Sequence, residues 1–259
     1  MKKQDLKSLS RNELKKWFKK EAYPEFRAEQ VFNWIYKNGV TDFAAMKNIP
    51  ADLRRELEAK AYVKSNLLLE ESRHADDGTI KFLWKLADGQ YIESVYLPYP
   101  EEKRHSVCIS SQVGCGMNCS FCATAKGGLV RNLTTGEIID QVLGIQREIS
   151  REEYGFPPIS NVVFMGMGEP LANLSAVLKA VEILNDEKGF GIGMRRITIS
   201  TCGLVPGIRE LARMDLQLVL AISLNAPNNQ VRDYLMPINK KYPIEDLLAA
   251  VRFYIKETK

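Results

Sequence analysis

From Ser106 onward the sequence alternates short apolar runs with longer amphipathic stretches. Each run has the length of a strand, and a loop and a segment of helical periodicity follow it. This order predicts βα units and therefore parallel strands. Because a closed barrel of this kind needs eight such units, we expect an α/β fold with a partial (β/α) barrel. The predicted strands are Ser106 to Ser110, Asn161 to Met165, Arg196 to Ser200 and Leu218 to Leu224.

The first hundred residues have a different character. The capping box Ser10-Arg-Asn-Glu13 opens a predicted helix, and a second helix is expected over 26–38 before Gly39. The turn signals Asp77-Gly78 and Asp88-Gly89 lie between alternating apolar residues and predict antiparallel hairpins. We therefore expect a small helical accessory domain that binds RNA, a β-hairpin extension and a core that is incomplete at its C-terminus, over residues 1–66, 67–100 and 101–259.

The end of the sequence also bears on the fold. The last predicted helix carries an apolar stripe that includes Leu247 and Val251, and the sequence stops at Lys259 without a further strand. Parallel sheets rarely leave such an edge uncovered. We therefore expect the sequence to be a fragment of a longer protein.

Composition narrows the class of protein. The chain has 259 residues and is 45% hydrophobic, which is typical of a soluble protein with a sizeable core. No segment approaches the roughly 20 consecutive apolar residues that cross a bilayer, so we expect no membrane association. Five cysteines are an odd number, and three lie close together, which favours a metal site in a reducing, cytoplasmic compartment over disulfides.

Positive charge gathers at the N-terminus. Residues 1–60 contain fourteen Lys and Arg against nine Asp and Glu. Such an excess favours an acidic partner such as RNA, whose phosphates attract cations regardless of sequence. The simpler interpretation is an ordinary solvated helix face.

The segment Cys115-Gly-Met-Asn-Cys119-Ser-Phe-Cys122 follows the first predicted parallel strand. Active sites of α/β proteins lie at this carboxyl edge of the sheet. Three thiolates satisfy three irons of a cubane cluster and leave the fourth iron open. Two alternatives are a structural zinc site with His105 as its fourth ligand, and cysteines that only pack. Zinc sites usually show paired ligand spacing, which is missing here.

The spacing CxxxCxxC, with the aromatic Phe121 before the last cysteine, resembles the radical S-adenosylmethionine (SAM) superfamily. The chain also resembles, over nearly its whole length, the RNA adenine C2 methyltransferases of the RlmN type (the RlmN/Cfr family). The related C8 methyltransferases have alanine after the Gly-Glu pair, so Pro170 favours C2. The motifs that carry this resemblance are Asp77 to Leu86, Cys108 to Cys115, Phe164 to Pro170 and Arg196 to Gly203.

The resemblance implies two cofactors, a 4Fe-4S cluster and SAM. Cys115, Cys119 and Cys122 are then the cluster ligands, and the carboxylate of Glu169 accepts a bond from the methionyl ammonium. Asn225 departs from the family, which usually has His there; a polar contact is retained, but a titratable ring is not. The implied cofactor-binding residues are Phe121, Gly168, Glu169, Ser200, Ser223, Leu224 and Asn225.

The resemblance also implies catalytic residues. Glu93 matches the base that removes the proton from adenine C2, and Cys108 matches the cysteine that resolves the protein–RNA adduct by forming a disulfide. In the family, the methyl group passes through a methyl-cysteine intermediate on a C-terminal cysteine. No equivalent precedes Lys259, so we expect this sequence alone not to complete a turnover. Cys202 matches no catalytic position and is interpreted as a packing residue.

The implied partners are 23S rRNA and tRNA as substrates and an electron donor such as flavodoxin, and we expect a monomer. Two other functions stay open at this point. One is a radical SAM methyltransferase acting on adenine C8, and the other is a zinc-dependent RNA-binding module without catalysis.

Overall fold

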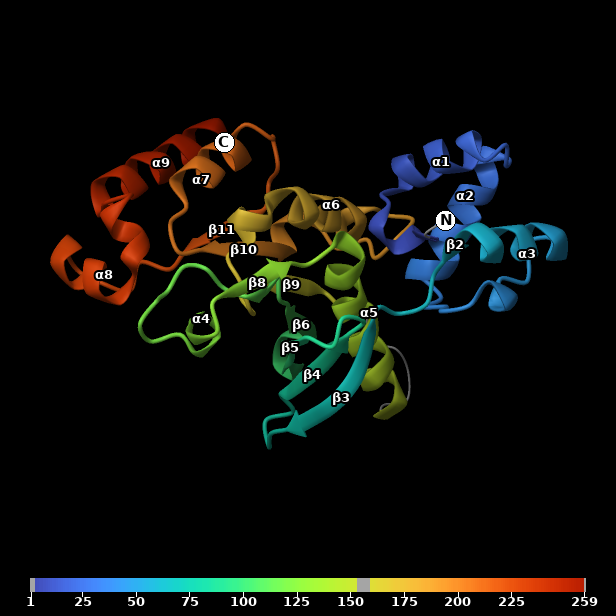
Figure 1. The fold of residues 1–259 in the computed structure, drawn as a ribbon, viewed down its shortest axis with the longest axis horizontal. Coiled ribbons are helices and arrows are strands. Elements are labelled where there is room, and N and C mark those ends of the chain that lie inside the picture. Colours follow the sequence, from blue (N-terminus) through green and yellow to red (C-terminus); the bar gives the residue numbers. More distant parts are fainter. Residues whose placement is uncertain (1–2, 153–158, 259) are drawn as a thin grey trace.

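The computed structural model of the chain describes residues 3–152 and 159–258 (Figure 1). Its centre is a seven-stranded sheet with the order β11-β10-β9-β6-β5-β4-β3. β6, β9, β10 and β11 are parallel, whereas β3, β4 and β5 are antiparallel. The strands are β3 Leu67–His74, β4 Ile80–Leu86, β5 Tyr91–Tyr99, β6 Arg104–Cys108, β9 Asn161–Phe164, β10 Ile197–Thr201 and β11 Val219–Ile222.

The predicted α/β class is confirmed, with parallel strands in the core and antiparallel hairpins before it. Both hairpin turns form where expected, because Gly78 and Gly89 adopt φ angles of +81° and +82°. The hairpins do not form a separate layer. β5 pairs with β6, with Val95 opposite Cys108, so the hairpin strands extend the sheet of the core.

Helices cover one face of this sheet. Figure 1 shows α6, α7 and α9 above β10 and β11, and α5 along β3 and β4. α5 approaches the sheet closely because Gly144 lies against Trp84, where an added Cβ would be 2.8 Å from the indole ring. None of the helices in the described residues is long and apolar enough to cross a membrane. The helices are α5 Thr135–Glu152, α6 Leu174–Asn185, α7 Val205–Ala212, α8 Asn229–Leu235 and α9 Ile244–Glu257.

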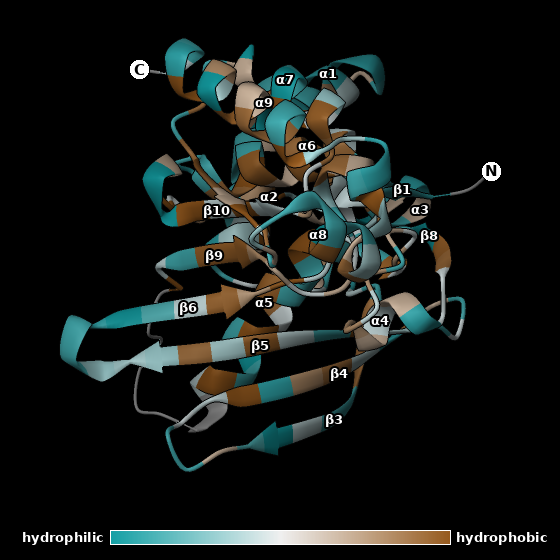
Figure 2. Cartoon of the chain, turned by 90° about the vertical axis from the view of Figure 1, so that its left-hand side faces the viewer, coloured by the Kyte–Doolittle hydropathy of each residue, from teal (hydrophilic) through white to brown (hydrophobic). Residues whose placement is uncertain are grey.

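The opposite face of the sheet carries the more polar side chains. Side chains alternate between the two faces along a strand, so Glu93 and Val95 share one face of β5. In the sheet register Val95 lies opposite Cys108, Cys108 lies opposite Val163 of β9, and Val163 lies opposite Thr198 of β10. Ser200 lies two residues further along. Glu93, Cys108 and Ser200 therefore lie on the same face of the sheet, whose strands are seen in Figure 2.

The N-terminal part contains three α-helices and two short strands. The short strands β1 Gln4–Asp5 and β2 Ala61–Tyr62 pair in parallel and close it. The predicted capping box forms, because Ser10 Oγ accepts from the backbone N of Glu13 and Glu13 Oε2 accepts from the backbone N of Ser10. The second helix ends two residues earlier than predicted. The helices are α1 Arg11–Lys20, α2 Glu25–Tyr36 and α3 Ala51–Lys60.

A buried polar cluster joins this unit to α5. Lys7 Nζ lies 3.0 Å from Asp5 Oδ1 and 3.6 Å from Asp140 Oδ2. Asn66 donates to the same Asp140 oxygen from its backbone N and its Nδ2, at 2.8 and 2.9 Å. Burial raises the pKa of Asp140 to about 6. The contact between the N-terminal unit and α5 is therefore polar at this point, and its strength depends on whether Asp140 is protonated.

Candidate active site

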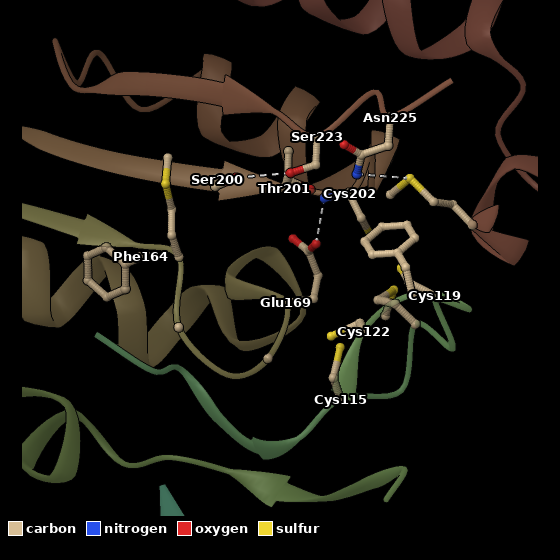
Figure 3. Close-up of a pocket in the computed structure, with 16 residues that line it drawn as sticks. Cys115, Cys119, Cys122, Phe164, Glu169, Ser200, Thr201, Cys202, Ser223 and Asn225 are labelled. Carbon is tan, nitrogen blue, oxygen red and sulfur yellow. Dashed lines mark hydrogen bonds between the residues drawn. The ribbon is translucent and has the colours of Figure 1, made fainter. Parts of the chain in front are cut away.

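A pocket opens at the carboxyl edge of the parallel strands (Figure 3). Four segments supply most of its wall: the loop after β7 Gln112–Gly114, the loop after β9, and the ends of β10 and β11. The residues that line it are Cys115, Met117, Cys119, Phe121, Cys122, Phe164, Met165, Gly166, Gly168, Glu169, Ser200, Thr201, Cys202, Ser223, Asn225 and Met236.

The three motif cysteines lie together in this pocket, with their sulfur atoms on the side that faces Glu169 (Figure 3). Their loop is shaped by its backbone, since Cys115 N donates to Gly128 O at 2.9 Å across the pair formed by β7 and β8 Leu129–Asn132. A Cβ on Gly114, whose φ is +72°, would lie 2.0 Å from that same oxygen. Only glycine therefore allows this approach.

The three thiols are the donor type that iron–sulfur clusters use, and within the described residues no three His, Cys, Asp or Glu side chains are grouped to hold a single metal ion. Burial, together with the neighbouring sulfur atoms and Glu169, raises the pKa of Cys115 and Cys119, so the free thiols hold their protons at neutral pH. Thiols become ligands only on deprotonation, and an all-thiolate set suits iron–sulfur clusters. His105 lies outside this pocket on β6, where its Nδ1 is 2.6 Å from Tyr96 Oη. The zinc alternative thus loses the fourth ligand that the sequence suggested for it.

Glu169 enters the pocket from the loop after β9. Its carboxylate is almost fully buried and accepts from Cys202 N at 2.8 Å and from Leu171 N at 3.1 Å. Gln112 fixes the backbone, because its Oε1 accepts from Glu169 N at 2.8 Å. The loop can lie this close to Gln112 because residue 168 is glycine, with a φ of +99°. Glu169 is therefore a fixed, buried acceptor.

The ends of β10 and β11 supply neutral polar groups. Ser200 Oγ and Ser223 Oγ are 3.3 Å apart, and Asn225 Nδ2 donates to Met236 Sδ at 3.6 Å. Leu224 is not part of the pocket wall; it is half-buried and packs against the core. Phe121 is 57% exposed and lies at the pocket rather than inside the core.

The two residues expected to be catalytic lie outside this pocket. Cys108 is half-buried on β6, and burial raises the pKa of its thiol to about 11, so it is protonated at neutral pH. Glu93 is half-buried on β5, where its Oε1 is 2.6 Å from Lys81 Nζ. Both share the open sheet face with Ser200. The structure thus gathers nine of the expected site residues in one pocket and leaves Glu93, Cys108 and Leu224 beside it.

Two residues near the pocket had no predicted role. Cys202 is buried, as a packing residue should be, but it also lines the pocket and donates its backbone N–H to Glu169. Burial and the nearby Glu169 carboxylate raise the pKa of its thiol far above the ordinary value. Arg232 lies behind the wall, and its Nη2 donates to Cys202 O. The sequence placed Cys202 two residues after a predicted strand and inside the motif Arg196 to Gly203, but neither signal indicated its contact with Glu169.

Comparisons with known proteins agree with this geometry. The model for the ribosomal RNA large subunit methyltransferase N-terminal domain matches residues 4–63, and the radical SAM superfamily model matches residues 109–258. Over 247 residues the chain is 47% identical to the probable dual-specificity RNA methyltransferase RlmN of Clostridium novyi, covering 95% of this chain and 70% of the relative. The chain belongs to the RlmN family of radical SAM enzymes.

Other RlmN-family members and a solved structure give the same result. The dual-specificity RNA methyltransferase RlmN of Geotalea uraniireducens is 46% identical, with 98% of this chain and 71% of the relative covered. The crystal structure of a radical SAM methyltransferase from Sphaerobacter thermophilus superposes with a TM-score of 0.90 at 43% identity, covering 98% of this chain and 73% of that one. This RlmN-family chain thus spans about 70% of the length of these relatives.

Proposed function

We propose that this radical SAM RNA methyltransferase acts on C2 of adenine in 23S rRNA and tRNA. The observation that carries the proposal is the placement of three cysteines and a buried glutamate in one pocket at the carboxyl edge of parallel strands. Relatives that carry the name dual-specificity RNA methyltransferase support RNA as the substrate. Pro170, directly after the Gly-Glu pair, favours C2 over C8.

The chain's own residues have distinct tasks in this proposal. Cys115, Cys119 and Cys122 would hold a 4Fe-4S cluster, and three thiolates would leave one of its irons available to SAM. When bound, the cluster supplies the single electron that breaks a carbon–sulfur bond of SAM. Glu169 accepts from the methionyl ammonium. Two backbone N–H groups already hold this carboxylate in place, so little ordering is needed when the cofactor binds.

The remaining pocket residues orient the cofactor. Ser200, Ser223 and Asn225 offer hydroxyl and amide groups to the polar parts of SAM. Leu224 contributes through its backbone, which sets the course of the chain between Ser223 and Asn225. Phe121 has its ring exposed at the pocket, where it can pack on the adenine of the cofactor.

Glu93 and Cys108 serve the RNA adduct in this proposal. Their position on the open sheet face, outside the cofactor pocket, suits groups that act on RNA rather than on SAM. Glu93 supplies the carboxylate that accepts a proton from adenine C2, and its Oε1 is held 2.6 Å from Lys81 Nζ. Cys108 keeps its proton until it attacks, because burial raises its pKa.

The proposal also covers the partners of the enzyme and the division of the chain into domains. The basic N-terminal unit contacts RNA, although Lys15 and Lys19 already pair with Glu29 and Glu25, so only part of its charge is available. A flavodoxin-type protein supplies the electron, and the enzyme is a cytoplasmic monomer.

The proposed division is 1–66 for the RNA-binding unit, 67–100 for the hairpin extension and 101–259 for the radical SAM core. The described sheet runs through the last two without a break.

The proposal is tested in a bacterial strain that lacks its own adenine C2 methylation. We expect expression of this sequence extended past Lys259 to the C-terminal cysteine of the family to restore 2-methyladenosine in rRNA and tRNA, measured by mass spectrometry of digested nucleosides, and expression of residues 1–259 alone to restore none. Expression of the same extended sequence with Cys119→Ser is the matched control and should restore none. Appearance of 8-methyladenosine in place of 2-methyladenosine would assign the enzyme to the C8 type instead.

A further inference from the structure

Arg232 is a completely buried cation whose direct partners are all uncharged. It belongs to α8 and has 0% exposure. Its Nε donates to Leu224 O at 3.1 Å, its Nη1 donates to Asn239 Oδ1 at 2.9 Å, and its Nη2 donates to Cys202 O. Within the described residues no ion pair compensates its charge. A buried charge of this kind is costly, so a stabilising anion is expected nearby.

The nearest carboxylate does not fill this role directly. Asp233 Oδ1 accepts from Asn239 Nδ2 at 2.7 Å, and the same Asn239 amide accepts from Arg232 through its oxygen. The negative charge of Asp233 therefore reaches the guanidinium only through a neutral amide. Burial lowers the pKa of Arg232, and negative charge at Cys119, such as a cluster ligand carries, favours its charged form.

Arg232 also fixes the backbone of the pocket wall. The carbonyls of Cys202 and Leu224, at the ends of β10 and β11, both accept from the same guanidinium. Gly203 permits this contact, because a Cβ there would lie 3.1 Å from Arg232 Nη2, and its φ is +108°. A planar guanidinium with its donors in a fixed fork holds two such carbonyls at a defined separation.

The same residue, Cys202, connects Arg232 to the cofactor site. Its backbone N donates to the Glu169 carboxylate, while its backbone O accepts from Arg232. A shift of the Cys202 backbone would therefore move the donor that orients Glu169. The neighbouring loop is linked to α8 as well, because Ser120 N donates to Leu235 O at 2.9 Å.

We propose that Arg232 is a positioning residue of the cofactor site, which fixes Glu169 through the backbone of Cys202 and stabilises the negative charge of the three-cysteine cluster. This inference rests on the proposed function, because that function places the cluster and SAM in the pocket. Arg232 touches neither the cofactor nor the reacting atoms and acts through other groups.

The test compares two substitutions that separate charge from hydrogen bonding. Arg232→Gln removes the charge but keeps one amide donor group, whereas Arg232→Lys keeps the charge but loses the fork. Arg209→Gln, an exposed arginine on the neighbouring α7, is the matched control. Each chain is reconstituted with iron and sulfide without oxygen. The readouts are the iron content, the midpoint potential of the cluster from an EPR-monitored titration, and the Kd for SAM from calorimetry.

We expect Arg232→Gln to lower the midpoint potential, because a nearby positive charge favours the reduced, more negative cluster. We expect both Arg232 variants to raise the Kd for SAM by about tenfold, the effect of losing one hydrogen bond to a charged group. Arg232→Lys should keep a potential near that of the native chain. Arg209→Gln should change neither quantity.

Native values of both the potential and the Kd in a folded Arg232→Gln chain would overturn the inference. If that variant does not fold, Arg232→Lys decides, because an unchanged Kd there contradicts the positioning role. A native chain that binds neither iron nor SAM would overturn the proposed function and this inference together. If the native chain binds iron and SAM, and the Arg232 variants keep its midpoint potential and its Kd for SAM, only this inference is overturned.

Discussion

Gly168 offers the sharpest test of how the pocket is built. Its φ of +99° lies where side chains are rarely found, and it leads directly into Glu169. In Gly168→Ala, the new Cβ would lie 2.5 Å from Gln112 Cβ and 2.8 Å from Gln112 N. The second contact is with backbone and cannot be relieved by a side-chain rotation. The loop must therefore move away from Gln112.

The expected loss of stability has two parts. A non-glycine residue at such a φ costs about 1–2 kcal/mol. Forcing a methyl group into a closely packed site costs about 1–3 kcal/mol more. We therefore expect Gly168→Ala to lower the free energy of unfolding by about 3 kcal/mol. The loop movement should also weaken SAM binding, because the bond from Glu169 N to Gln112 Oε1 would be stretched from its 2.8 Å.

Gly191→Ala is the matched control for this substitution. Gly191 also has a positive φ, +67°, but an added Cβ there would meet nothing within 4 Å. It should lose only about 1 kcal/mol, which is the backbone part alone. Urea denaturation of the three chains, followed by circular dichroism, measures the difference. Equal losses in Gly168→Ala and Gly191→Ala would refute the close approach between the Glu169 loop and Gln112.

Three further outcomes follow from other parts of the structure. Ser94→Ala should lower the free energy of unfolding by about 1–3 kcal/mol, because buried Trp84 Nε1 loses its acceptor at 2.6 Å. Asp140→Asn should become more stable relative to the native chain, by up to about 3 kcal/mol, as the pH rises from 4 to 7, because Asp140 has a raised pKa of about 6 and ionises in this interval. Cys119→Ser should lose bound iron and sulfide after anaerobic reconstitution while its helix content in circular dichroism stays native.

Each of these outcomes has its own control. Ser72→Ala removes an exposed hydroxyl from the same sheet, so a loss equal to that of Ser94→Ala would argue against the buried bond. For Asp140, the folded native chain holds its proton more tightly than the unfolded chain, so the stabilising contribution is complete below a pH of about 4 and is lost as the pH rises through about 6. A pH-independent difference between the native chain and Asp140→Asn would contradict the assignment. Full iron content in Cys119→Ser would exclude Cys119 as a ligand.

Sequence reasoning succeeded where the signal was local. The capping box at Ser10, the glycine turns at Gly78 and Gly89, and the four core strands depend on residues a few positions apart. The pocket at the carboxyl edge was also expected, since βα topology brings the ends of successive strands together. The structure places the three cysteines, Gly168, Glu169, Ser200, Ser223 and Asn225 at that edge.

The rest depends on contacts between distant residues that have no sequence signature. Arg232 bonds to carbonyl groups, which every residue possesses, so no residue type marks its partners. Asp140 meets Lys7 and Asn66 only because α5 packs against the N-terminal unit. The pairing of Glu93 with Lys81 depends on the register of β4 and β5, which a one-residue slip would change.

The central claim is that the three-cysteine pocket holds a 4Fe-4S cluster with one iron open to SAM. Mössbauer spectra of the chain, reconstituted with isotopically enriched iron and recorded with and without SAM, test it most directly. We expect SAM to change the signal of one iron site and to leave the other three as they were. A spectrum that SAM does not alter in a fully loaded sample would contradict it.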